Sequence, residues 1–199
     1  MDQRSDVATS AAEAGRVRPT DAEVRSVLRT LGEPENAGVL LQGTDRAARH
    51  SLAAAVVRAL GDRAALVVPV DGPTDADEML EAVADELEDA ARANGHPDAH
   101  PWHALAVPLR NREQHWTARF QLLTVHVLPH WPVLFRYQDV EADLTAAGTF
   151  ADPDLGALVA AWVHDPGRGR AVLTSAAPVA LPTNPDRPLR THHVGAAAR

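Results

Sequence analysis

The sequence predicts an α/β fold built on a mainly parallel β-sheet. Short, continuous apolar runs alternate along the chain with longer segments of helical periodicity. Such runs are typical of parallel strands that are covered on both faces, and parallel strands need helical, right-handed crossovers. The chain has 199 residues and is 45% hydrophobic, which is enough for one well-buried domain.

The N-terminal part of the chain is predicted to add one helix before the first strand. Residues 1–19 are polar, Ala-rich and aperiodic, which favours a disordered segment or a linker. Thr20 and Glu23 have the spacing of a capping box, and Gly32 with Pro34 should end the helix that follows. The apolar stripe of that helix consists of Val24, Val27, Leu28 and Leu31.

Five strands and their connecting helices follow in alternation. The strands are predicted at residues 39–42, 65–70, 132–137, 170–175 and 189–194. Helices are predicted at residues 51–60, 75–93 and 112–128, and a further one begins at Pro153 after Asp152. Residues 95–109 are rich in Pro and His and are predicted to form a loop.

Composition excludes several classes of function. The net charge of −8 and the pI near 5.6 argue against nucleic acid as a partner. All 19 basic residues are Arg and Cys is absent, so Lys chemistry, disulfides and thiolate metal sites are excluded. The chain shows no leader and no apolar run of membrane-spanning length, which predicts a cytoplasmic protein without a membrane partner.

A candidate nucleotide site follows the first strand. A phosphate-binding loop has the pattern G-x-x-x-x-G-K-[ST] between a strand and a helix. Here Gly43 takes the first Gly position, Ala48 the second, Arg49 the Lys position and His50 the hydroxyl position. The candidate cofactor-binding residues are Gly43, Thr44, Asp45, Arg46, Ala47, Ala48, Arg49, His50 and Ser51. The alternative interpretation is an ordinary strand-to-helix turn.

Motifs farther along the chain support the first interpretation. They are "PVLFRYQDVE" from Pro132, "PGRGR" from Pro166, "LTS" from Leu173, "LP" from Leu181 and "HVG" from His193. In this order they resemble the STAND class of P-loop ATPases (NB-ARC- or NACHT-like), above all bacterial members with tetratricopeptide repeats and CHAT domains. The resemblance covers residues 37–195, with a helix and linker at 20–36 and a tail at 196–199.

The resemblance implies a three-layer αβα P-loop NTPase-like fold with a mainly parallel, five-stranded sheet. Its strand order would be 5-1-4-3-2, with an additional strand between the two Walker strands. It also implies ATP and magnesium as cofactors, and it adds Gln138, Asp139, Thr174 and Ser175 to the candidate nucleotide site.

Several signature positions depart from the family pattern. Gln138 stands where the family has the Walker B aspartate, and an amide lacks that charge; Asp139 would need a one-residue slip of the strand. Arg49 needs more room than a lysine, and His50 has no hydroxyl for magnesium. Ala176 stands where the sensor arginine is expected. No catalytic residue or metal ligand is therefore assigned.

These departures predict a catalytically impaired regulatory or scaffolding module in a bacterial signalling or conflict system. The alternatives are an active ATP-binding switch that a partner completes in trans, or a truncated fragment without a selected function. The predicted partners are a nucleotide and either a protein or further domains of a split STAND system.

Two other expectations can be tested. His96, His100 and His103 could meet a zinc ion, but their Pro-rich segment lacks rigid spacing, so no metal site is assigned. If the loop alignment is correct, replacing Ala48 by Gly, Arg49 by Lys and His50 by Thr should strengthen nucleotide binding by about 2–4 kcal/mol.

Overall fold

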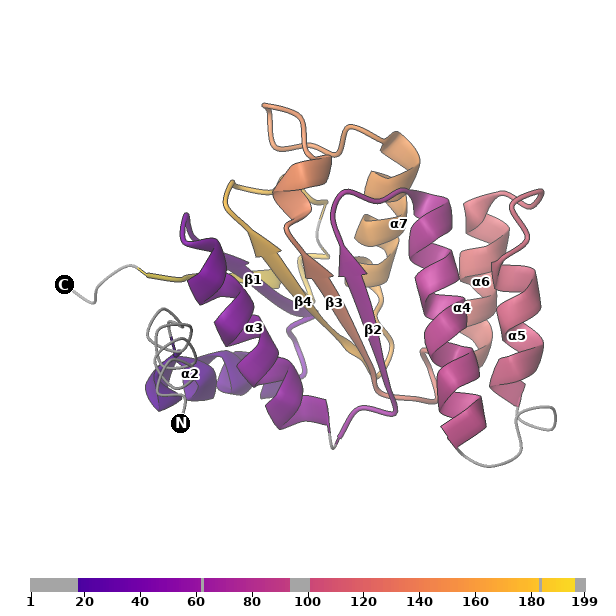
Figure 1. Ribbon diagram of the computed structural model, residues 1–199, viewed down its shortest axis with the longest axis horizontal. Coiled ribbons are helices and arrows are strands. Elements are labelled where there is room, and N and C mark those ends of the chain that lie inside the picture. The colour runs from indigo at the N-terminus through magenta and orange to yellow at the C-terminus, as the bar shows by residue number, and fades with distance from the viewer. Residues whose placement is uncertain (1–17, 62, 94–100, 183, 196–199) are drawn as a thin grey trace, which may run out of the picture.

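A computed structural model describes residues 18–61, 63–93, 101–182 and 184–195. Within these residues, five strands form one parallel sheet in the order β2-β3-β4-β1-β5 (Figure 1). The strands are β1 (Gly38–Gln42), β2 (Leu66–Asp71), β3 (Val133–Gln138), β4 (Arg170–Ser175) and β5 (Leu189–His193). The α/β class and the strand order 5-1-4-3-2 are thereby confirmed, and β4 lies between β1 and β3 as expected.

Helices cover both faces of this sheet, which makes a three-layer αβα arrangement (Figure 1). The helices are α2 (Asp21–Gly32), α3 (Arg46–Gly61), α4 (Ala76–Ala93), α5 (Pro101–Leu109), α6 (Trp116–His126) and α7 (Pro153–His164), with a short 3-10 helix η2 (Val140–Asp143). On one side the sheet packs against α2 and α3. The helices α4, α6 and α7 pack on the other side.

Two helix starts follow the sequence rules. At the start of α2, the Thr20 hydroxyl accepts a hydrogen bond from the Glu23 amide at 3.2 Å, and the Glu23 carboxylate accepts one from the Thr20 amide at 2.8 Å. These bonds form the predicted capping box. The Asp152 carboxylate caps α7, whose first residue is Pro153.

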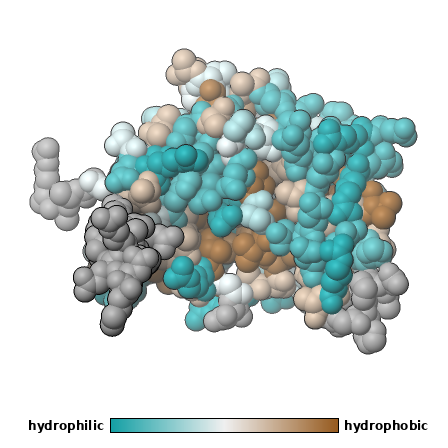
Figure 2. Space-filling model, in the orientation of Figure 1, coloured by the Kyte–Doolittle hydropathy of each residue, from teal (hydrophilic) through white to brown (hydrophobic). Residues whose placement is uncertain are grey.

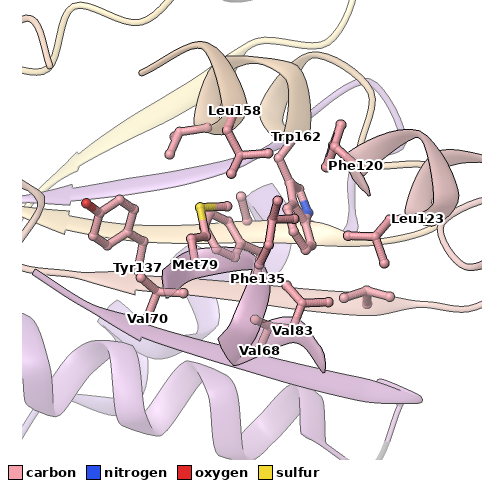
Figure 3. Packing of buried hydrophobic residues seen from close by; sticks show 14 of the residues in the cluster. Val68, Val70, Met79, Val83, Phe120, Leu123, Phe135, Tyr137, Leu158 and Trp162 are labelled. Atoms are coloured by element: carbon pink, nitrogen blue, oxygen red, sulfur yellow. The ribbon is translucent and has the colours of Figure 1, made fainter. Parts of the chain in front are cut away.

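The larger hydrophobic core lies between the sheet and α4, α6 and α7 (Figure 3). Phe135 of β3 stacks on Trp162 of α7, with ring centroids 4.6 Å apart. Phe120 of α6 completes this aromatic group. Tyr137 donates a hydrogen bond to Asp143 at 2.6 Å. Burial is the main cause that raises the pKa of the Tyr137 phenol, and the hydrogen bond to Asp143 raises it further. The core therefore fixes β3 and the start of the segment that follows it.

The opposite face of the sheet is covered less completely. Along β2, Leu66 and Val68 are buried in the larger core, whereas Val67 and Pro69 on the other face are only partly buried. Figure 2 shows hydrophobic surface between α3 and α4, over this part of the sheet. The smaller core beneath α2 and α3 consists mainly of Val27, Leu31, Val39, Leu41, Leu52, Val56, Leu134 and Val172.

One predicted loop is wrong where the structure describes it. Residues 95–109 were expected to be irregular, but Pro101–Leu109 forms α5, while residues 94–100 lie outside the described part of the chain. Trp102 and Leu109 are buried against the rest of the larger core. Arg110, just after α5, is paired with Asp85 and Glu88 of α4. Apolar burial and these ion pairs override the low helical preference of a Pro-rich segment.

Candidate functional site

The candidate nucleotide site lies where the carboxyl ends of β1, β3 and β4 meet the start of α3. Ligands of open parallel α/β sheets bind at this edge. The Gly43 amide donates a hydrogen bond to the Ser175 carbonyl at 3.1 Å. The Asp139 amide donates one to the Thr174 hydroxyl at 3.0 Å. The structure thus brings together the three segments that the sequence assigned to the site.

The loop itself is shorter than predicted. Helix α3 begins at Arg46, five residues before the predicted start at Ser51, so that start is wrong. Only Gly43, Thr44 and Asp45 separate β1 from α3. The Asp45 carboxylate accepts a hydrogen bond from the Ala48 amide at 3.0 Å. A carboxylate of the chain therefore occupies the helix N-terminus, where the amides of a phosphate loop would bind an anion.

Arg49 fills the space beside this short loop. Its side chain is 1% exposed, and one guanidinium nitrogen donates a hydrogen bond to the Gly43 carbonyl. The other terminal nitrogen lies 2.6 Å from Glu141 Oε1 and 3.3 Å from Asp139 Oδ1. A buried guanidinium requires such partners, because an unpaired buried charge is strongly destabilising.

Arg46, Arg49, His50, Asp139 and Glu141 form an ion-pair cluster, and Asp139 lies at its centre. Arg46 donates to its Oδ2 atom at 2.9 and 2.5 Å, and His50 Nε2 lies 2.8 Å from its Oδ1 atom. Burial raises the pKa of the carboxyl, but hydrogen bonds from Arg46 and His50 together outweigh burial and leave the pKa below its ordinary value. Asp139 is therefore an ionised and fully engaged acceptor.

No slip of β3 is needed to place Asp139. Gln138 is paired in register with Asp71 of β2. Asp139 follows with φ of 55° and ψ of 43°, a left-handed conformation that aspartate tolerates better than most residues. Because this conformation redirects the chain, the Asp139 side chain faces α3 although the strand keeps its register.

The other predicted site residues contribute less to this cluster. Gln138 is half-buried, and its carbonyl accepts a hydrogen bond from the Gly72 amide. Ser175 is buried, and its hydroxyl accepts one from the Ala177 amide at 3.2 Å. Thr44 and Ala47 are exposed. None of these positions provides a free charged group.

Two α3 residues of the predicted loop face elsewhere. Ala48 belongs to the smaller hydrophobic core, and Ser51 lines a pocket between α2 and α3. Sequence reasoning also missed Glu141, which binds Arg49. The signal for the early start of α3 was present, because Asp45 is a favourable N-cap residue and the Ala-rich segment after it favours a helix.

These residues do not fit ATP with magnesium. The guanidinium groups of Arg46 and Arg49 are paired with the carboxylates of Asp139 and Glu141. A third carboxylate, from Asp45, caps the start of α3. Both oxygens of Asp139 accept hydrogen bonds from the protein. The Asp45 carboxylate already binds the Ala48 amide, and Arg46 and Arg49 are paired with carboxylates. The position of the magnesium-binding hydroxyl holds His50.

Gly43 has a packing role that requires no phosphate. A Cβ atom at this position would lie 2.4 Å from the Val194 carbonyl oxygen, in the segment that follows β5. We expect Gly43→Ala to lower the free energy of unfolding by about 1–3 kcal/mol, because backbone must move to relieve this overlap. Chemical denaturation measures the change.

Gly61→Ala is the matched control for Gly43→Ala. Gly61 ends α3, and a Cβ atom there would meet nothing within 4 Å. This substitution should leave stability unchanged or raise it slightly, since Ala favours a helix more than Gly does. Equal effects of the two substitutions would contradict the packing role of Gly43.

The described residues contain neither a group of potential metal ligands nor a helix suited to crossing a membrane. There, no group of three or more His, Asp or Glu side chains is arranged to hold a metal ion. Of the three histidines considered for zinc, His103 lies on α5, whereas His96 and His100 lie outside the described part of the chain. No helix in this part combines the length and apolar character that crossing a membrane requires.

No protein-family model and no curated protein matches the chain. Among solved structures, a chain from the structure of Drosophila ORC bound to AT-rich DNA and Cdc6 is similar, with a TM-score of 0.47 and 16% identity. The alignment covers 89% of this chain and 54% of that chain, so this protein spans about half the length of its structural neighbour.

The neighbour corrects one prediction from composition. The acidic net charge led us to exclude nucleic acid as a partner, and the matched structure contains AT-rich DNA. Net charge alone is therefore an insufficient reason for the exclusion, and we withdraw the predicted set of partners. At this level of similarity the match carries no argument about what the present chain binds.

Proposed function

We propose that this chain is a STAND-type P-loop domain that does not hydrolyse ATP and acts as a regulatory or scaffolding module in a bacterial signalling or conflict system. The observation that carries this proposal is the position of Arg49. Its buried guanidinium binds Gly43, Asp139 and Glu141, beside the loop to which the sequence assigns the nucleotide phosphates.

Phosphoryl transfer explains why this arrangement opposes catalysis. The reaction depends almost entirely on positioned cations and metal ions that stabilise charge on the transferred group. Here Arg46 and Arg49 of α3 are neutralised by Asp139 and Glu141. Ala176, beyond β4, is exposed and supplies no cation where the family has its sensor arginine.

The same contacts argue against a complete ATP-dependent switch. We expect a nucleotide phosphate to enter only if the buried Arg49 guanidinium leaves its carboxylate partners. Removing one partner from a buried ion pair costs about 3–5 kcal/mol, which would be subtracted from the binding energy of the nucleotide. A domain whose own ion pairs occupy the predicted phosphate loop is instead suited to keeping one conformation, as a scaffolding module does.

We expect ATP with magnesium to bind more weakly than about 10 μM, which is roughly −7 kcal/mol. The physical reason is that the anion position at α3 is capped by Asp45 and the nearby cations are paired. Isothermal titration calorimetry on the full chain measures the affinity, and a phosphate-release assay measures turnover.

Magnesium provides the control for this measurement. Any residual ATP binding should be unchanged when magnesium is replaced by EDTA, because His50 and Gln138 are poor ligands for a hard cation. A dissociation constant below about 10 μM that requires magnesium would contradict the proposed function.

A further inference from the structure

A pocket of about 830 Å³ lies between α2 and α3, outside the ion-pair cluster. The two helices lie side by side (Figure 1). Small residues of α3, Ala54 and Ala55, line the pocket together with Val24 of α2. Because these side chains are short, the helices cannot fill the space between them. The hollow is therefore a consequence of the Ala-rich sequence of α3.

The polar lining of this pocket is mainly basic. Arg18 and Arg25 come from the α2 side and Arg58 from α3, while Asp21 is the one carboxylate among the described residues that line the pocket. All three arginines are exposed. Within the described residues, none of them makes a hydrogen bond or an ion pair, so their guanidinium groups are available to a ligand.

This pattern differs from the arginines that stabilise the fold. Arg110 and Arg112 bind carboxylates of α4, and Arg119 binds Asp77. In an acidic chain with net charge −8, carboxylates are the more abundant charged groups. Three arginines without such partners around one pocket are therefore not explained by the stability of the fold.

We propose that this pocket binds a ligand with two linked phosphate groups, held by Arg18, Arg25 and Arg58 without magnesium. Guanidinium groups match phosphate oxygens in geometry and form charge-assisted hydrogen bonds with them. The pocket, of about 830 Å³, has room for more than one phosphate group, and its arginines come from both the α2 side and α3. The Ser51 hydroxyl also lines the pocket and adds a hydrogen-bonding group.

This pocket is a different site from the one that the proposed function concerns, and the inference goes beyond that function. The proposed function concerns the closed position at Gly43 and Arg49, whereas the pocket is open and lies farther along α3. His50 borders both, since it lines the pocket and contacts Asp139. Binding of a diphosphate here leaves the prediction for magnesium-dependent ATP binding unchanged.

The test is calorimetry of the full chain with sodium pyrophosphate in EDTA at low ionic strength. We expect a dissociation constant of roughly 10–100 μM that weakens as salt is added, because exposed charges are screened. The double variant Arg25→Ala/Arg58→Ala should bind at least about tenfold more weakly, since two of the three cations are lost. Both arginines are exposed and unpaired, so the variant should fold normally.

Two comparisons make the test specific. The double variant Arg29→Ala/Arg63→Ala removes the same charge from exposed positions outside the pocket, and it should bind pyrophosphate like the wild type. Citrate, a polycarboxylate, should bind at least about fivefold more weakly than pyrophosphate. Absence of pyrophosphate binding, equal losses in the two double variants, or equal affinity for citrate would each overturn the proposal.

Discussion

Replacing Asp139 by Asn is expected to lower the free energy of unfolding by about 3 kcal/mol. Asp139 is 10% exposed and accepts hydrogen bonds from Arg46, Arg49 and His50. Asn keeps the left-handed backbone conformation and one oxygen acceptor but removes the charge. Arg49, whose side chain is 1% exposed, would retain only Glu141 as a charged partner. Removal of one partner from a buried ion pair typically lowers the free energy of unfolding by about 3–5 kcal/mol.

Chemical denaturation monitored by circular dichroism measures this loss. Asp89→Asn is the matched control, because Asp89 is paired with Arg92 on the exposed surface of α4. Surface ion pairs contribute about 0–1 kcal/mol, so the control should change stability little. If Asp139→Asn were as mild as the control, the cluster would not hold the site closed.

The pH dependence of stability gives an independent measure of the same contact. Despite its burial, the pKa of Asp139 lies below the ordinary value of 3.8, owing to hydrogen bonds from Arg46 and His50. Its ionised form therefore stabilises the folded state fully above that value, and the contribution is lost as the pH falls through the lowered pKa. The difference between wild type and Asp139→Asn should shrink as the pH falls from about 5 to about 2.

The fold was largely predictable because burial leaves a periodic signal in the sequence. The apolar run of β4 and the strand signals of the other four segments each appear within one or two residues of the predicted bounds. The capping residues Thr20 and Asp152 marked the starts of α2 and α7 in the same way. Helix α5 was missed because its stability comes from contacts with α4, which local propensity does not encode.

The position of the candidate site could be predicted from the sequence, but its side-chain contacts could not. Parallel strands bring their carboxyl ends to one edge, so the meeting of the Gly43 loop with Asp139 and Ser175 follows from topology. Whether Arg49 points to solvent or to a carboxylate depends on the side chains around it in three dimensions. The left-handed conformation of Asp139 brings its carboxylate to Arg49, and the pattern of apolar residues in the sequence does not predict that conformation.

The same geometry reverses the expected effect of restoring the loop. The alignment alone predicts that Ala48→Gly, Arg49→Lys and His50→Thr together strengthen ATP binding by about 2–4 kcal/mol. In the structure, α3 starts at Arg46 and the Asp45 cap binds the backbone amide of residue 48, so we expect both to persist after these changes. They also replace the Arg49 guanidinium, whose several hydrogen bonds a lysine cannot reproduce.

We therefore expect the triple variant to bind ATP with magnesium no more tightly than the wild type, with a dissociation constant above about 10 μM. It should also be less stable than the wild type by about 2–4 kcal/mol, because Glu141 loses its buried partner and Gly enters a helix. Calorimetry and chemical denaturation on the same preparation test both parts. A stable variant that binds ATP below about 10 μM would show that the loop can open into a phosphate site, and that the ion pairs of Arg49 are what closes it in the wild type.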